Sequence, residues 1–168
     1  MPLVGDMDSM PATIDSPSHV PITAIAEAAR RTGTTIAVAE SLTGGLLANA
    51  FAAAPEASEW FRGGIVAYAA EVKHDLFGTP PGPVVTPETA RAMATAAARL
   101  LGAEIGVGVT GVGGPGSEEG QPPGTVYIAV AKGDVVSDTA VTLHGDPASV
   151  VAGTVRAALD ATSAAMSD

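Results

Sequence analysis

The amino-acid sequence predicts an α/β fold, a three-layer α/β/α sandwich around a mostly parallel mixed sheet that includes an antiparallel strand. The main observation is that segments of helical period alternate with short β-branched or apolar runs along most of the chain. This alternation is typical of parallel sheets with crossover helices. A second observation is that two strand-like runs follow each other directly across Lys132-Gly133-Asp134. They predict a hairpin, and hence the antiparallel strand.

The composition supports this architecture. The 168 residues are 46% hydrophobic but only 4% aromatic, so the core has to be built from Ala, Val, Ile and Leu, which suits helices packed on a sheet. The length is that of one domain. Residues 1–19 are rich in Pro, Ser, Asp and Met and lack a clear period, which predicts a flexible tail. Residues 20–168 are expected to form a single domain.

The elements of this domain can be justified in chain order. The first helix, at residues 22–33, is amphipathic and stops at Gly33. The clearest helix spans residues 86–102, because Thr86 is a good N-cap, Pro87 suits the first helical position and Gly102 ends it. The other expected elements are a strand at 34–40, a helix at 43–54, a strand at 63–69, a helix at 70–78, an irregular connection at 79–85, a strand at 103–111, a Gly/Pro loop at 112–124, two strands within 125–143 and a closing helix at 146–166.

Charge and cysteine content exclude several functions. The net charge of −10 repels nucleic-acid backbone and anionic membranes, so we expect neither as a partner. No window approaches ~20 uninterrupted apolar residues, and no Lys or Arg precedes Arg30. We therefore expect no membrane span, no secretory signal and a cytoplasmic protein. The absence of cysteine excludes disulfides and thiolate chemistry. The histidines, His19, His74 and His144, are too scattered to predict a metal site.

Three polar or Gly-rich segments follow strands of the predicted sheet. They are ESLTGG at 40–45, AYAAEVK at 67–73 and TGVGGPG at 110–116. Ligands of open α/β sheets bind beyond the carboxyl ends of the strands, so these segments are expected to meet at one crevice.

Ser41 is the first candidate in that crevice. It lies at a strand-to-helix turn, where the N–H groups of the helix start can stabilise negative charge, and Gly44 and Gly45 allow close approach of backbone or ligand. The alternative is that Ser41 or Thr43 only caps the helix.

A serine nucleophile needs a base, and Lys73 is the candidate. The chain has two lysines, and Lys132 lies at the hairpin turn. A lysine desolvated near a strand end can lose its proton near neutral pH and accept the Ser41 proton. The alternative is a surface lysine. Tyr68, expected at the end of the same strand, could orient Lys73 or bind substrate, or be a half-buried core tyrosine.

The loop VTGVGGPG offers backbone amides and the Thr110 hydroxyl. Gly-rich turns can form anion-binding nests, but this one matches neither the phosphate-loop pattern nor GxGxxG. A plain surface loop is the alternative.

The stretches AESLTGG, WFRGGIVAYAAEVKHDLFG and GVGVTGVGGPGSEEGQPPGTVYIAVA together resemble the CinA C-terminal domain family, which includes stand-alone nicotinamide-nucleotide amidases. The resemblance covers roughly Ile22 to the C-terminus. It implies an anticodon-binding-domain-like sandwich, no metal and no cofactor. It also implies hydrolysis of nicotinamide mononucleotide to nicotinate mononucleotide and ammonia. The implied catalytic residues are Ser41 as nucleophile, Lys73 as base and Tyr68; the implied substrate-binding residues are Thr43, Gly44, Gly45, Thr110, Gly111, Gly113 and Gly114.

Three features depart from the family pattern. Ala70 replaces an asparagine, the connection at 79–85 is short, and Pro147 and Val151 stand where arginines are usual. Three readings therefore remain: a nucleotide amidase with a rearranged phosphate site, an amidase for another small amide, and a non-catalytic binding or partner module. The Ala-rich helices also allow a homo-oligomer.

Overall fold

The computed structural model describes residues 20–167 and contains a five-stranded sheet in the order β2-β1-β3-β4-β5. β1 pairs in parallel with β2 and β3, whereas β4 is antiparallel to β3 and β5. Four strands thus point one way and β4 the other, which confirms the predicted mixed sheet. The tail predicted at residues 1–19 lies outside the described residues. The strands are Ile36–Glu40 (β1), Phe61–Val66 (β2), Ile105–Gly111 (β3), Thr125–Lys132 (β4) and Val135–Thr142 (β5).

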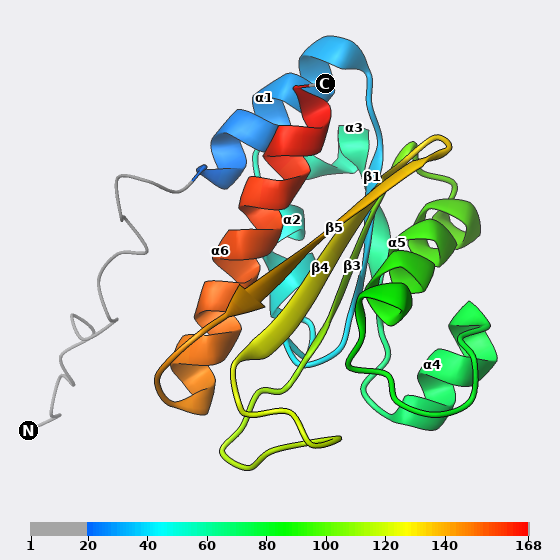
Figure 1. The fold of residues 1–168 in the computed structure, drawn as a ribbon. Coiled ribbons are helices and arrows are strands. Elements are labelled where there is room, and N and C mark those ends of the chain that lie inside the picture. The colour runs from blue at the N-terminus through cyan, green and yellow to red at the C-terminus, as the bar shows by residue number, and fades with distance from the viewer. Residues whose placement is uncertain (1–19, 168) are drawn as a thin grey trace, which may run out of the picture.

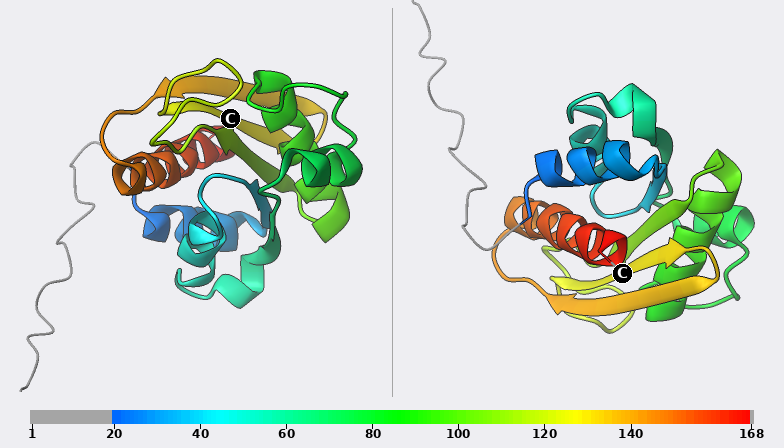
Figure 2. Two further views of the ribbon diagram at one scale, coloured as in Figure 1. Left: turned by 90° about the horizontal axis from the view of Figure 1, so that it is seen from below. Right: turned by 90° about the horizontal axis from the view of Figure 1, so that it is seen from above.

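Helices cover both faces of the sheet (Figure 1 and Figure 2). One face packs against α1, α2, α3 and α6, and the other against α4 and α5. The strands alternate accordingly: Ile36 and Val38 join the core under α1 and α6, while Ala37 and Ala39 face α4 and α5. The helices are Ile22–Thr32 (α1), Leu46–Ala52 (α2), Ala57–Trp60 (α3), Ala70–Phe77 (α4), Pro87–Leu101 (α5) and Pro147–Met166 (α6).

The helix α5 lies unusually close to β3 because two strand positions are glycines. A Cβ atom added at Gly108 would lie 2.2 Å from the Ala90 carbonyl oxygen, and one added at Gly106 would lie 1.9 Å from that of Ala94. No side chain fits at either position. The close approach holds the carboxyl end of β3, and the loop that follows it, directly beside the start of α5.

The expected signals at α5 and at the hairpin are confirmed. The Thr86 hydroxyl accepts a hydrogen bond from the Thr89 N–H, Pro87 is the first helical residue, and Gly102 ends the helix in the left-handed region. The β4–β5 turn consists of Gly133 and Asp134.

Two boundaries near the cavity and one short helix differ from the prediction. β2 ends at Val66, so Tyr68 lies beyond the strand. The helix expected at 43–54 begins only at Leu46, because Gly44 and Gly45 have positive φ values that belong to a turn. The four-residue helix α3 was missed since it is too short to show a period. Within residues 20–167, no helix combines the length and apolar character needed to span a membrane.

Candidate active site

A cavity of about 380 Å³ lies where β1 and β3 end and the loop after β2 begins. All three predicted segments contribute to it, so the structure brings them together at one crevice. The sequence-predicted residues that line the cavity are Ser41, Tyr68, Lys73, Gly111, Gly113 and Gly114; the further lining residues are Leu42, Ala70, Val84, Val85, Glu118 and Glu119.

The turn that carries Ser41 is built on the Glu40 carboxylate. This side chain is completely buried and one of its oxygens accepts hydrogen bonds from the Thr43 hydroxyl (2.6 Å), the Gly45 N–H (2.8 Å) and the Leu47 N–H (3.1 Å). The other oxygen accepts the Ala48 N–H at 2.8 Å. Four donors and the positive end of a helix satisfy a buried charge that would otherwise be costly. Glu40 therefore caps α2.

Ser41 is consequently not the helix cap. Its side chain is 4% exposed, lines the cavity, and makes no hydrogen bond within residues 20–167. The capping alternative is wrong for Ser41, and for Thr43 as well, because the Thr43 hydroxyl donates to Glu40 rather than accepting from the helix. The Ser41 oxygen opens onto the cavity, because no enclosed side-chain oxygen in the described residues lacks a hydrogen-bond partner, and it is therefore available for chemistry.

Lys73 is buried on the first turn of α4, with 4% of its surface exposed, so the surface-lysine alternative is wrong. Burial lowers the pKa of its ammonium group, and the negative charges of Glu119 and Glu118 oppose this change. The Nζ atom donates to the Tyr68 carbonyl oxygen at 3.3 Å. It makes no hydrogen bond to Ser41 in the described part of the chain. Direct proton transfer between the two therefore requires Nζ or Oγ to move into hydrogen-bond reach of the other.

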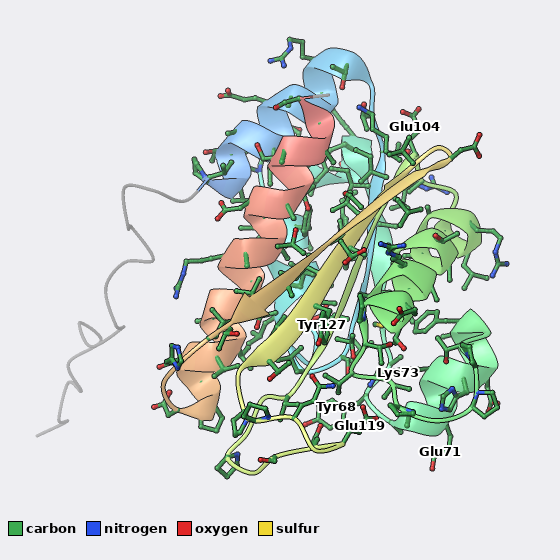
Figure 3. The ribbon with its side chains drawn as sticks, in the orientation of Figure 1. Tyr68, Glu71, Lys73, Glu104, Glu119 and Tyr127 are labelled. Atoms are coloured by element: carbon green, nitrogen blue, oxygen red, sulfur yellow. The ribbon has the colours of Figure 1, made fainter. Side chains whose placement is uncertain are left out.

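Tyr68 stands at the mouth of the cavity beside Lys73 and Glu119 (Figure 3). Its side chain is 73% exposed, so the expectation of a half-buried core tyrosine is wrong. The backbone carbonyl, rather than the phenol, contacts Lys73. The phenol hydroxyl remains free to meet a ligand at the opening.

The connection at 79–85 forms a wall of the cavity and does not fill it. The Glu119 carboxylate accepts the N–H groups of Val84 and Val85, both at 2.8 Å. The Val84 carbonyl accepts the Thr110 hydroxyl at 2.9 Å, and the Val85 carbonyl accepts the Gln121 side-chain amide. Every backbone polar group of this dipeptide is thus held by a side chain from the segment 110–121.

The same hydrogen bonds place the Thr110 side chain outside the cavity. Its hydroxyl was expected to touch substrate, but it is 1% exposed, donates to Val84, and does not line the cavity. Gly44 and Gly45 do not line it either. Thr110, Gly44 and Gly45 thus lie behind the residues that line the cavity and support them.

The backbone N–H groups at the start of α2 are also already hydrogen-bonded within the protein. The N–H of Gly44 bonds the Ser41 carbonyl, that of Leu46 bonds the Thr43 carbonyl, and the rest of the first turn bonds Glu40. The expectation that these amides face a developing charge is therefore wrong. The N–H groups of Leu42 and Gly113, both from cavity-lining residues, make no hydrogen bond within residues 20–167.

Glu118 and Glu119 were missed by sequence reasoning. Their only sequence signal was an acidic pair inside a Gly/Pro-rich loop, which by itself is more typical of a solvated turn. In residues 20–167, no three carboxylate or imidazole groups lie close enough together to ligate a metal ion.

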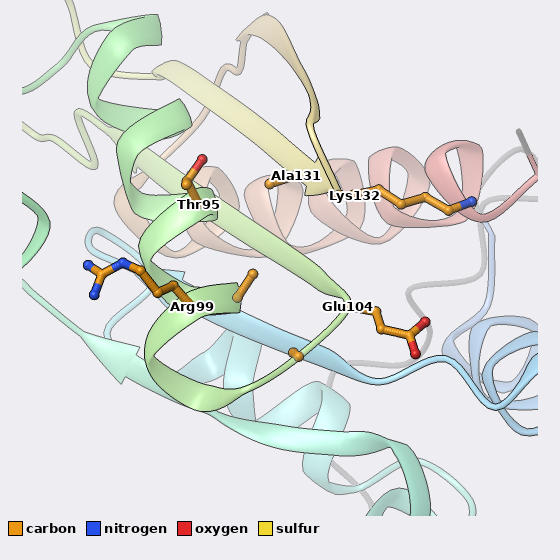
Figure 4. Close-up of a pocket in the computed structure, with 8 residues that line it drawn as sticks. Thr95, Arg99, Glu104, Ala131 and Lys132 are labelled. Atoms are coloured by element: carbon orange, nitrogen blue, oxygen red, sulfur yellow. The ribbon is translucent and has the colours of Figure 1, made fainter.

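A larger, more open groove of about 520 Å³ lies between α5 and the β4–β5 turn (Figure 4). Its polar side chains, Thr95, Arg99, Glu104 and Lys132, are all exposed. Glu104 lies at the opposite end of the molecule from Lys73 (Figure 3). This groove contains no buried nucleophile or base, so the smaller cavity is the candidate site.

The family profile of the CinA C-terminal domain matches residues 20–166. The chain belongs to the CinA C-terminal domain family. A "putative competence-damage inducible protein" of Desulforamulus reducens is 44% identical over 132 residues, 76% of this chain and 32% of that protein. A "CinA-like protein" of Frankia casuarinae is 44% identical over 131 residues, 75% of this chain and 30% of that one. This chain thus spans about a third of the length of the curated relatives it matches.

Solved CinA superfamily structures share the fold. One from Klebsiella pneumoniae has a TM-score of 0.83 at 30% identity, with 87% of this chain and 95% of that chain covered. One from Escherichia coli has a TM-score of 0.81 at 27% identity, with 88% and 91% covered. The names of these relatives refer to CinA or to competence damage and state no reaction, so any reaction has to be argued from the site.

Proposed function

We propose that this CinA domain is an amidohydrolase of the nicotinamide-nucleotide amidase type, which converts nicotinamide mononucleotide to nicotinate mononucleotide and ammonia. The observation that carries the proposal is the Ser41 hydroxyl, 4% exposed and without a partner in the described chain, in the same 380 Å³ cavity as the buried Lys73 amine. A cavity of this size is within the range that holds small-molecule ligands.

The reaction would begin with neutral Lys73 accepting the Ser41 proton while Ser41 Oγ forms a bond to the carboxamide carbon. The carbonyl electron pair moves onto oxygen, giving a tetrahedral oxyanion. The free N–H groups of Leu42 and Gly113 are the candidate donors to it. Protonated Lys73 then donates its proton to the leaving nitrogen as the C–N bond breaks, which releases ammonia and leaves an acyl ester on Ser41.

Water completes the cycle. Lys73, neutral again, removes a proton from a water molecule that attacks the ester carbon, and the returning proton restores the Ser41 hydroxyl. The acid product leaves as a carboxylate. The balance is one amide and one water consumed, and one carboxylate and one ammonium formed.

The test is ammonia release from nicotinamide mononucleotide by the wild type and by Ser41→Ala and Lys73→Ala. We expect Ser41→Ala to lower kcat by about 10³-fold or more and Lys73→Ala by about 10²- to 10⁴-fold. The matched controls are Ser58→Ala and Lys132→Ala, which replace exposed residues outside the cavity and should keep kcat within about twofold. If the folded wild type shows no turnover, the proposal of a nucleotide amidase fails. An amidase for another small amide and a non-catalytic binding module then remain.

A further inference from the structure

We propose that Glu119 is a positioning residue of this site, which acts through Lys73. The N–H groups of Val84 and Val85 hold its carboxylate in a fixed place, and from there its charge stabilises protonated Lys73 without forming an ion pair with it. This inference rests on the proposed hydrolysis at Ser41, in which Lys73 becomes a cation and later gives up its proton. It gives a role to an acidic loop residue that the sequence alone did not single out.

The backbone conformation of Glu119 is the first observation. Glu118 and Gln121 exchange backbone hydrogen bonds at 3.1 and 2.8 Å across a tight turn, and the two residues between them, Glu119 and Gly120, have φ values of 53° and 74°. Turns with two positive φ values favour Asn-Gly or Gly-Gly, because other side chains are strained there. Within residues 20–167, Glu56 is the only other non-glycine residue with a positive φ. A strained residue that lines a cavity points to a role for its side chain.

The carboxylate of Glu119 is fixed by the cavity wall that it holds. One oxygen accepts the Val84 N–H and the other accepts the Val85 N–H, both at 2.8 Å. The Val85 carbonyl is bonded in turn by the Gln121 side-chain amide at 2.5 Å. A charge held in this way needs little reorganisation when an opposite charge appears nearby. Glu119 is therefore a negative charge of fixed position.

Glu119 and Lys73 line the same cavity without touching each other. Both contribute to its wall, and Figure 3 shows them together with Tyr68 at one end of the sheet. The Nζ atom of Lys73 donates to the Tyr68 carbonyl oxygen at 3.3 Å. In the part of the chain that the structure describes, it forms neither a hydrogen bond nor an ion pair with Glu119. The two side chains interact through their charges.

Glu119 is also the charge with the largest effect on Lys73. Burial lowers the pKa of the lysine ammonium group, and of the negative charges that raise this pKa, Glu119 has the larger effect and Glu118 the smaller. The other titratable groups on the elements around Lys73 are either exposed or bonded elsewhere: Glu40, Tyr68, Glu71, His74, Asp75 and Glu88.

This arrangement suits a base that has to be charged for only part of the reaction. When Lys73 accepts the Ser41 proton it becomes a cation, and a fixed negative charge stabilises that state. A glutamate that was free to move would form an ion pair with the amine and keep it protonated. Because Val84 and Val85 restrain Glu119, its carboxylate is not free to follow Nζ. Glu119 takes up no proton itself, since the proton passes from Ser41 to Lys73 and on to the leaving nitrogen.

The first experiment titrates Lys73 directly and needs no turnover. The chain has two lysines, so lysine labelled with ¹³C at Cε gives two NMR signals, and Lys132→Ala identifies the one from Lys73. We expect Glu119→Gln to lower the midpoint of the Lys73 titration by about 0.3–1 pH unit. Glu104→Gln makes the same charge change at the opposite end of the molecule and should leave the midpoint within about 0.2 unit. An unchanged or raised midpoint in Glu119→Gln would overturn the proposal.

Gln121→Ala separates the charge of Glu119 from its hold on the wall. This variant removes the side-chain hydrogen bond to the Val85 carbonyl and leaves the net charge unchanged. If Glu119 acted only by holding the wall, both variants would move the Lys73 midpoint alike. We expect Gln121→Ala to keep the midpoint within about 0.2 unit. A shift as large as that of Glu119→Gln would contradict the electrostatic role.

The second experiment follows kcat for ammonia release from nicotinamide mononucleotide across pH, because kcat reports ionisations in the substrate complex. We expect Glu119→Gln to move the acid side of the profile to lower pH and to lower the plateau by about three- to tenfold. Glu104→Gln should do neither. An unchanged plateau in Glu119→Gln would overturn the positioning role and leave the proposed function standing. A wild type without turnover would defeat the proposed function instead, and the titration would still decide whether Glu119 stabilises protonated Lys73.

Discussion

The Thr43 hydroxyl donates to the buried Glu40 carboxylate at 2.6 Å, directly behind the serine turn. Glu40 also accepts hydrogen bonds from the N–H groups of Gly45, Leu47 and Ala48 at the start of α2. The turn that presents Ser41 is thus organised by a residue that does not line the cavity.

Glu40→Ala is expected to lower the free energy of unfolding by about 3–5 kcal/mol, because it leaves several buried donors unpaired. Urea denaturation followed by circular dichroism measures this change. Glu27→Ala, at an exposed position of α1, is the matched control and should change stability by no more than about 0.5 kcal/mol. A Glu40→Ala protein within about 1 kcal/mol of wild type would refute the capping role.

Glu119→Ala should release the Val84-Val85 dipeptide from the loop. Amide hydrogen exchange at these two positions is the direct measurement, since both N–H groups are bonded to Glu119. We expect exchange to accelerate by about tenfold or more there and to stay unchanged in β3. Glu71→Ala, exposed on α4 and outside the cavity, supplies the comparison. Unchanged protection of Val84 and Val85 in Glu119→Ala would contradict the clamp.

The pH dependence of amide hydrolysis should report the pKa of Lys73. Burial lowers that pKa, so kcat/KM should rise about tenfold per pH unit in acid and level off below the ordinary lysine value of about 10.4. Glu119 and Glu118 raise the pKa against the effect of burial. Glu118→Gln should therefore move the rise to lower pH, whereas Glu104→Gln should not. A shift to higher pH in Glu118→Gln would have the wrong sign for this electrostatic account.

Gly108→Ala should destabilise the domain by about 2–3 kcal/mol, because the added Cβ would lie 2.2 Å from the Ala90 carbonyl oxygen. Gly116→Ala is the control, since its added Cβ has no heavy atom within 4 Å; it should stay within about 0.5 kcal/mol. Thermal unfolding of both variants measures the difference. Equal melting temperatures would mean that α5 can move away from β3 at little cost.

The layers and the strand directions could be predicted because they depend on local period and turn chemistry. The α5 boundaries followed from Thr86, Pro87 and Gly102 in the same way. The position of the crevice could be predicted from where the strands end. Ser41 and Lys73 could be singled out because each stands next to such an end.

Two of the errors at the site arise from contacts between residues that are distant in the sequence. The Thr110 hydroxyl bonds to a residue 26 positions away, and Glu119 bonds to residues 34 and 35 positions away. No local pattern encodes such pairings. Tyr68 was misplaced because β2 ends two residues earlier than its apolar run, which left an aromatic side chain in solvent.

Glu40, whose buried carboxylate holds the turn, is a different residue from Ser41, which would react. Replacing Ser41 removes a hydroxyl without a structural bond in the described chain, so the cost in folding is small. Under the proposed function, a single substitution at Ser41 would therefore abolish activity and leave a folded domain, whereas loss of Glu40 would lower stability and disturb the turn together. Position 41 can thus be changed to remove the proposed chemistry at little structural cost, and position 40 cannot.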